Sequence, residues 1–248
     1  RLCLLGTVLI LRPLSAAAQD PEEDQPSRPS THQSLNLTVH GYGISFGNSA
    51  RVNGLRFNIQ DYGLERVNGV NVTFWKPKEP LSGTVNGLAL GFVGPGVEEV
   101  NGIAVGLGGV VAERRVRWLA VGGLGIVSNG TIDGVSIAGL GVVSQGRMRG
   151  IHVAGLGAVS QGSLDGVSIA GLGVVAQGRI RGISIAGLGA VAEGPLEGVH
   201  LAGLGVVSQG RLLGISIAGL ATVAEGDVQG VALGGLAVVS GREIQGLS

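Results

Sequence analysis

Residues 134–165 read GVSIAGLGVVSQGRMR followed by GIHVAGLGAVSQGSLD, two 16-residue units that align without a gap. Glycine recurs at this period from Gly102 to Gly246, with Trp118 in one of the glycine places. The units before Gly102 are looser, with spacings of 15 and 18 residues between their VNG triplets. A fixed period indicates one supersecondary unit, copied about twelve times here, whose stability comes from its neighbours.

The pattern inside one unit is typical of strands and turns. We number each unit from its opening glycine, so that Gly134 is position 1 and Arg149 is position 16. Positions 2 and 4 carry branched apolar residues, and this alternation predicts a β-strand. The Ala-Gly pair at positions 5 and 6 breaks the alternation as a bulge or corner would, and the polar positions 11–14 predict a turn. No segment has helical spacing, so we expect an all-β structure.

Two all-β arrangements fit this unit. A β-solenoid of 16-residue glycine-rich coils stacks equivalent positions about 4.8 Å apart, whereas an antiparallel transmembrane β-barrel places successive turns at opposite ends. The stretch GVSIAGLGVVS is as long as a membrane strand. However, no aromatic residue follows Leu119, so the aromatic girdles of a membrane barrel are missing. We therefore favour the solenoid, with positions 2, 4, 7 and 15 inward and Ala at 5 and Val at 10 forming an outer apolar strip.

Position 16 alternates in charge along six units. The residues of this predicted charge ladder are Arg117, Asp133, Arg149, Asp165, Arg181 and Glu197. In a solenoid, neighbouring side chains of the ladder would attract each other. In a barrel, basic and acidic side chains would gather at opposite rims, so the alternation alone does not choose between the two folds.

Asparagine takes position 16 in the looser units. It precedes glycine at Asn53, Asn68, Asn86 and Asn101. Stacked coils would let these amides form a hydrogen-bonded ladder. A simple turn preference of asparagine is the other explanation.

The chain divides into four segments by composition. Residues 1–18 resemble a signal peptide, because the apolar run from Leu2 to Leu11 is followed by three alanines. Residues 19–34 are polar and proline-rich, which predicts a disordered spacer. Residues 35–53 would form an N-terminal cap or first strand, and residues 54–248 the repeat domain. We expect an exported protein of the cell surface, periplasm or outer membrane.

The sequence predicts no catalytic, cofactor or metal site. Charges balance at 17 basic and 17 acidic residues, so nothing favours nucleic acid as a partner. The GLG triplets occur in every unit without a following helix, unlike dinucleotide-binding loops. Cys3 is the only cysteine. His152 and His200 are three units apart, too far for one metal site, and we expect them to face solvent.

One irregular insertion is a candidate recognition loop. Its residues Phe74, Trp75, Lys76 and Lys78 combine two aromatic side chains with two basic ones. Aromatic residues on loops favour binding, although an ordinary surface turn explains the insertion equally well.

The unit VNGLALGF at residues 85–92 resembles a group of bacterial exported glycine-rich surface-repeat proteins with VNG-L-x-L-G units. The resemblance implies a bacterial cell envelope and no established activity. We expect a non-enzymatic structural or adhesive repeat protein. An outer-membrane β-barrel protein and a ligand- or carbohydrate-binding solenoid are the alternatives. The expected partners are a second copy, through the apolar strip or the uncapped C-terminal coil, or a membrane; the ligand is unknown.

Overall fold

The computed structural model describes residues 34–39, 42–75, 77–78 and 80–248. All regular structure in these residues is β-strand, as predicted. The expected signal peptide at residues 1–18 lies outside the described residues, and so does the expected spacer except for Ser34. Ser34 already opens the first strand, one residue earlier than expected.

The N-terminal strands begin with a hairpin. β1 and β2 pair antiparallel, and β2 then pairs in parallel with β3. Residues 35–53, expected to be a cap or first strand, thus contain most of β1, all of β2 and the start of β3. The bounds are β1 Ser34–Val39, β2 Tyr42–Gly47, β3 Arg51–Asn58, β4 Arg66–Thr73, β5 Thr84–Gly91, β6 Gly96–Gly106 and β7 Gly109–Gly122.

Each later coil contains one long and one short strand, joined by a corner at positions 6 and 7. The long strands are β9 Thr131–Ala138, β11 Met148–Ala154, β13 Leu164–Ala170, β15 Ile180–Ala186, β17 Leu196–Ala202, β19 Leu212–Ala218, β21 Val228–Gly234 and β23 Ile244–Leu247. The short strands are β8 Gly125–Ser128, β10 Gly141–Ser144, β12 Gly157–Ser160, β14 Gly173–Ala176, β16 Gly189–Ala192, β18 Gly205–Ser208, β20 Ala221–Ala224 and β22 Ala237–Ser240.

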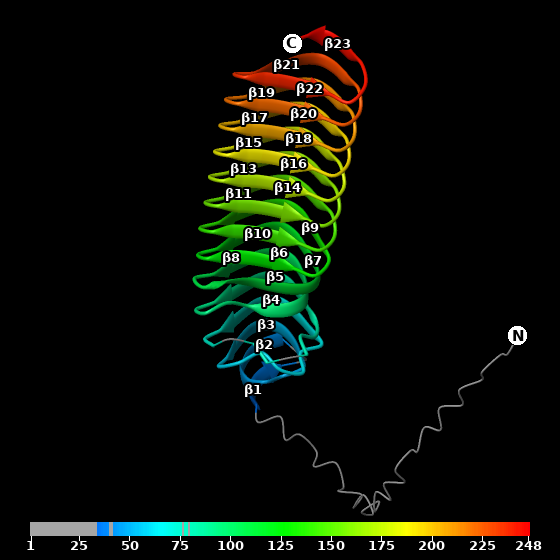
Figure 1. The fold of residues 1–248 in the computed structure, drawn as a ribbon. Coiled ribbons are helices and arrows are strands. Elements are labelled where there is room, and N and C mark those ends of the chain that lie inside the picture. The colour runs from blue at the N-terminus through cyan, green and yellow to red at the C-terminus, as the bar shows by residue number, and fades with distance from the viewer. Residues whose placement is uncertain (1–33, 40–41, 76, 79) are drawn as a thin grey trace, which may run out of the picture. The chain divides into compact units, whose positions relative to one another are not determined.

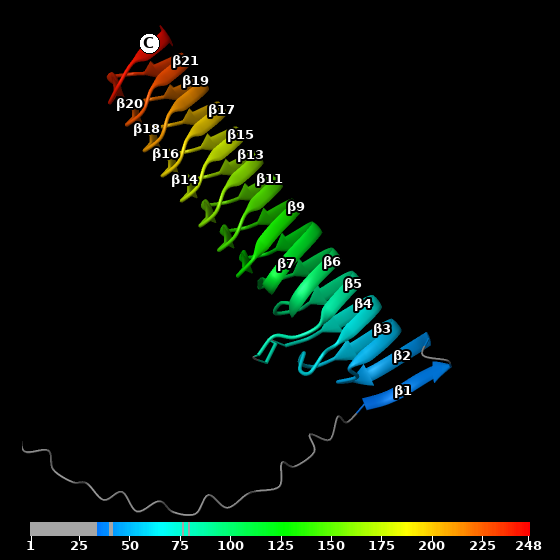
Figure 2. The ribbon, with the colours of Figure 1, turned by 90° about the vertical axis from the view of Figure 1, so that its right-hand side faces the viewer.

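The strands stack in parallel with a shift of one unit per coil. Gly134 pairs with Gly150, and Gly150 pairs with Gly166, so equivalent positions form columns along the stack. The described repeat is therefore a β-solenoid of about twelve turns (Figures 1 and 2). Among the described strands only β1 and β2 pair antiparallel, which excludes the alternative antiparallel barrel.

The interior is lined by small residues and one column of large ones. In one coil the buried residues are Leu164, Ser168, Ala170, Val174 and Ala176, at positions 15, 3, 5, 9 and 11. Of the positions that we expected inside, only 15 is buried; the expectation for positions 2, 4 and 7 was wrong. Sheets pack about 10 Å apart, and this narrow interior holds the larger Leu164 and Val174 together with the small Ser168, Ala170 and Ala176.

The backbone explains why two positions of the regular coils carry glycine. At position 1 the backbone has positive φ, 122° at Gly134, where side chains are strained. Trp118 occupies the same place with φ 83°, the one non-glycine residue with positive φ in the described part of the chain. At position 6 a Cβ on Gly171 would collide with the carbonyl oxygen of Gly155 in the preceding coil. Neighbouring coils therefore touch backbone to backbone at this corner.

Candidate functional site

The outer face of the long strands is apolar. We call the surface formed by positions 2 and 4 of these strands the long-strand face. At position 2, Ile151 and Ile183 are 45% and 40% exposed, whereas Val135 and Val167 are half-buried. A sheet with one face in water normally places polar residues on that face. A continuous apolar face instead indicates a contact surface.

The long-strand face extends along the regular coils in two columns. Position 2 contributes Leu119, Val135, Ile151, Val167, Ile183, Val199 and Ile215, and position 4 contributes Val121, Ile137, Val153, Ile169, Ile185, Leu201 and Ile217. Leucines at position 7, such as Leu172, and valines at position 10, such as Val175, are also exposed. The apolar surface is thus wider than the expected strip. It includes position 10, as expected, but not the alanines of position 5, which are buried.

The predicted charge ladder borders this face as one column. Its residues pair in register across successive long strands, in the order Arg117, Asp133, Arg149, Asp165, Arg181 and Glu197. The closest ion pair joins Arg181 Nη2 to Glu197 Oε2 at 2.8 Å. The hydrogen bond from Arg181 lowers the pKa of the Glu197 carboxyl, and the charges of the arginines nearby add to this effect. Position 14 also contributes, since Arg179 Nε lies 3.6 Å from Asp165 Oδ1.

The asparagines continue the same column toward the N-terminus. Asn68 donates to Asn53 at 2.7 Å, Asn86 to Asn68 at 2.8 Å, and Asn101 to Asn86 at 3.1 Å. All four lie inside strands and not in turns. The ladder interpretation is therefore confirmed, and the turn interpretation is wrong.

The candidate recognition loop follows β4. Phe74 and Trp75 are both exposed, and the Lys78 ammonium lies 5.0 Å from the centre of the Tyr62 ring. Lys76 lies outside the described residues. An apolar hollow of about 240 Å³ lies beside Phe74, between the side chains of Leu90 and Leu107. Phe74 thus borders apolar surface, while Lys78 contacts Tyr62.

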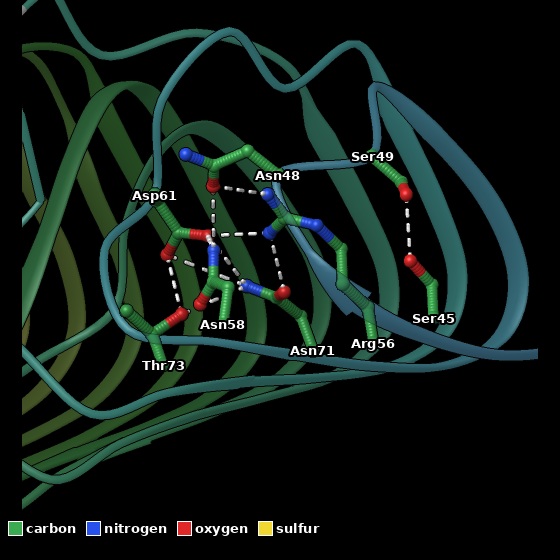
Figure 3. A network of polar contacts seen from close by, with 8 residues as sticks. All are labelled: Ser45, Asn48, Ser49, Arg56, Asn58, Asp61, Asn71 and Thr73. Atoms are coloured by element: carbon green, nitrogen blue, oxygen red, sulfur yellow. Dashed lines mark hydrogen bonds and ion pairs between the residues drawn. The ribbon is translucent and has the colours of Figure 1, made fainter. Parts of the chain in front are cut away.

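A buried polar network closes the N-terminal end of the interior (Figure 3). The Arg56 guanidinium donates to Asp61 Oδ1 at 2.6 Å and to Asn71 Oδ1 at 2.8 Å, and both charged side chains are almost fully buried. Asn58 and Thr73 donate to the same carboxylate, at 2.7 and 2.6 Å. The contacts within the network suit an internal plug that shields the first coils from water.

Sequence reasoning missed this network, although a signal was present. Arg56 and Asn71 take position 3, between the apolar residues of positions 2 and 4. They therefore project from the opposite side of the strand. Once the structure places position 3 inside, an arginine there must be buried, and it needs a partner such as Asp61.

The histidines lie in the interior and not in solvent, contrary to expectation. His152 and His200 are fully buried at position 3, in the column that carries serine in the neighbouring coils. Desolvation lowers the pKa of both imidazoles to about 4, although the charge of Asp133 acts in the opposite direction on His152. Ser184 Oγ lies 2.7 Å from His200 Nδ1. The rings fit because they are flat and neutral.

Within the described ranges, no three His, Cys, Asp or Glu side chains gather as a metal site would need. The same ranges contain no helix of the length and apolarity that a membrane span requires. Comparison with protein-family models, curated proteins and solved structures finds no significant match to this chain. The long-strand face, with its bordering charge column, is therefore the best-developed candidate site in the described structure.

Proposed function

We propose that this chain is a non-enzymatic structural or adhesive repeat protein of the bacterial cell envelope or surface. It acts through the long-strand face. The role is mechanical: a stack of coils presents one surface at a regular spacing, and each coil contributes the same small contact.

The observation that carries the proposal is the outward position of the branched residues. Ile151, Ile169 and Ile183 lie on the surface, while serine and alanine take many of the interior places beside buried residues such as Leu164 and Val174. Exposed aliphatic columns of this length oppose solubility, so a use in binding is the physical reason to keep them. The polar clusters that could have suggested chemistry, such as Arg56 with Asp61, are enclosed and bonded internally.

The proposal predicts that the purified full chain sediments with bacterial envelope fragments. The double variant Ile151→Thr, Ile183→Thr should bind about tenfold more weakly, since each change removes roughly one to two apolar carbons from the contact. Threonine keeps the β-branched shape that suits a strand. Bound and free protein are measured by centrifugation and quantitative gel analysis.

The control places threonine on the short strands. Val143 and Val175 are each 37% exposed at position 10, so Val143→Thr, Val175→Thr adds the same hydroxyl outside the long-strand face and removes one apolar carbon at each site instead of two. This control should bind like the unaltered chain. If the unaltered chain stays in the supernatant, or if both double variants behave alike, the proposed role of the long-strand face is wrong.

A further inference from the structure

We propose that the partner of the long-strand face is a second copy of this chain. The two solenoids lie antiparallel, related by a twofold axis that runs along the strand direction between the coils of Arg149 and Asp165. This inference rests on the proposed function, because it names the occupant of the same face; envelope fragments are then expected to bind through it where they carry this protein. The occupant is identified from the charge, the shape and the size of the surface.

The charge column is complementary to its own reverse. A twofold axis along the strands reverses the order of the position-16 residues along the stack. It also places this column opposite the same column of the partner. Arg149 then faces the partner's Asp165, and the next pairs outward also join opposite charges: Asp133 with the partner's Arg181, and Arg117 with the partner's Glu197. Charges at the rim of an interface set its register. A parallel arrangement about an axis along the stack lacks this match, because it sets position 16 against apolar columns.

The apolar column of position 2 has the same two-coil alternation. Isoleucine and valine alternate from Val135 to Ile215, and the isoleucines stand further out. In the antiparallel pair, Ile151 faces the partner's Val167, and Ile183 faces the partner's Val135. Each larger side chain therefore meets a smaller one. Attraction between neighbouring charges within one chain explains the alternation at position 16. It does not require the alternation of isoleucine and valine at position 2.

Trp118 is the third observation. Its side chain is 75% exposed, and it holds a backbone conformation that costs a non-glycine residue energy. The other coils of the regular repeat carry glycine there. In the antiparallel pair Trp118 lies opposite the partner's Gly198, where no side chain obstructs it. Tryptophan is enriched among residues that dominate binding energy, which gives a reason for the strain.

The size of the face suits a stable dimer. Six coils at about 4.8 Å, each with a seven-residue strand at about 3.3 Å per residue, cover roughly 700 Å². A specific interface buries about 800 Å² on each partner, so the six coils with their flanks are sufficient. A second copy supplies an opposite charge to each residue of the charge column, which a lipid surface of one charge sign does not. A second copy is therefore favoured over a membrane.

Sedimentation velocity of the full chain at low salt tests the inference. The expected mass is twice 24.8 kDa. Arg149→Asp sets carboxylates against the partner's Asp165, and Asp165→Arg sets guanidiniums against the partner's Arg149. Each single variant should therefore raise the dissociation constant at least about tenfold. Circular dichroism confirms that each variant remains folded.

Mixing the two single variants tests the register itself. A chain with Arg149→Asp and a chain with Asp165→Arg are complementary at both central pairs, so the mixture should form a heterodimer about as tightly as the unaltered chain. The double variant Arg149→Asp, Asp165→Arg should remain a homodimer for the same reason. Trp118→Gly should weaken the dimer while leaving the melting temperature of the monomer unchanged or higher.

The outcomes separate the inference from the proposed function. A chain that sediments at 24.8 kDa at every accessible concentration overturns the dimer. A mixture of single variants that stays monomeric overturns the antiparallel register. If the monomeric chain instead pellets with vesicles of phosphatidylethanolamine and phosphatidylglycerol, the occupant is lipid and the inference is wrong. Sedimentation with envelope fragments tests the proposed function in every case.

Discussion

At the scale of single residues, the size of a side chain decides more than its polarity whether it lies in the interior. His152 and Ser168 lie side by side inside the solenoid, while Ile151 and Val167 lie outside on the same two strands. Burying a hydroxyl or an imidazole costs free energy unless it is hydrogen-bonded, and only part of this column is bonded, as at Ser184 and His200. The flat ring lies in a column that carries serine in the neighbouring coils.

The buried histidines predict a loss of stability in mild acid. Their pKa is about 4 in the folded chain, below the usual value of 6.5, so the unfolded chain binds the proton more readily. Their stabilising effect is complete above pH 6.5 and is lost as the pH falls toward 4. Each histidine should account for about 3 kcal/mol by pH 4.

Thermal melts between pH 8 and pH 4.5 measure this effect. The variant His152→Ser, His200→Ser makes both coils like their neighbours, and its melting temperature should fall much less over the same range. Equal slopes for the variant and the unaltered chain would show that the two imidazoles do not titrate on unfolding.

At the scale of elements, the corner between a long and a short strand determines how closely coils approach. Position 6 and position 8 are both glycine in most coils, but for different reasons. A Cβ on Gly171 would meet the backbone of the preceding coil, whereas a Cβ on Gly173 would lie an ordinary 3.5 Å from the Gly189 oxygen. Ala221 and Ala237 already occupy position 8 in the last coils. Of these two positions, only position 6 is limited by backbone contact.

This difference predicts opposite outcomes for two alanine substitutions two residues apart. Gly171→Ala should destabilise the chain by about 2 kcal/mol or more, because two coils must separate to admit the methyl group. Gly173→Ala should change stability by less than about 0.5 kcal/mol. Urea unfolding of both variants measures the effect, and similar midpoints would contradict the packing described at the corner.

At the scale of the whole stack, stability depends on how the first coil is closed. Each coil contacts only its neighbours, so a defect at one end should loosen the nearest coils first. The plug of Arg56 and Asp61 is buried, whereas the nearby ion pair of Arg51 and Glu65 is exposed. Exposed pairs contribute little to stability, but removing one partner of a buried pair leaves an uncompensated charge.

The plug therefore predicts fraying from the N-terminal end. Asp61→Ala should destabilise the first coils by about 3–5 kcal/mol. Amide hydrogen exchange should show faster exchange in β3, β4 and β5 than in β13 to β17. Glu65→Ala, the exposed control, should leave the exchange pattern nearly unchanged. Uniform loss of protection in all coils would contradict closure at one end.

The sequence by itself determined the repeat, the division into strands and turns, and the neighbours within each column. The 16-residue period places Arg149 beside Asp165 in any parallel stack, and the VNG triplets align Asn53 with Asn68. These features follow from local spacing, because strand alternation and glycine turns are properties of a few adjacent residues.

Only the tertiary structure decided which side of each strand faces inward. Alternation places Val167 and Ile169 on one side and Ser168 on the other, but it does not say which side is the interior. That choice depends on the distance in space between the sheet of long strands and the sheet of short strands, which come from different parts of the unit. In this narrow space position 3 carries serine or histidine beside the buried Leu164 and Val174, and the branched residues of positions 2 and 4 form the surface through which the molecule is proposed to act.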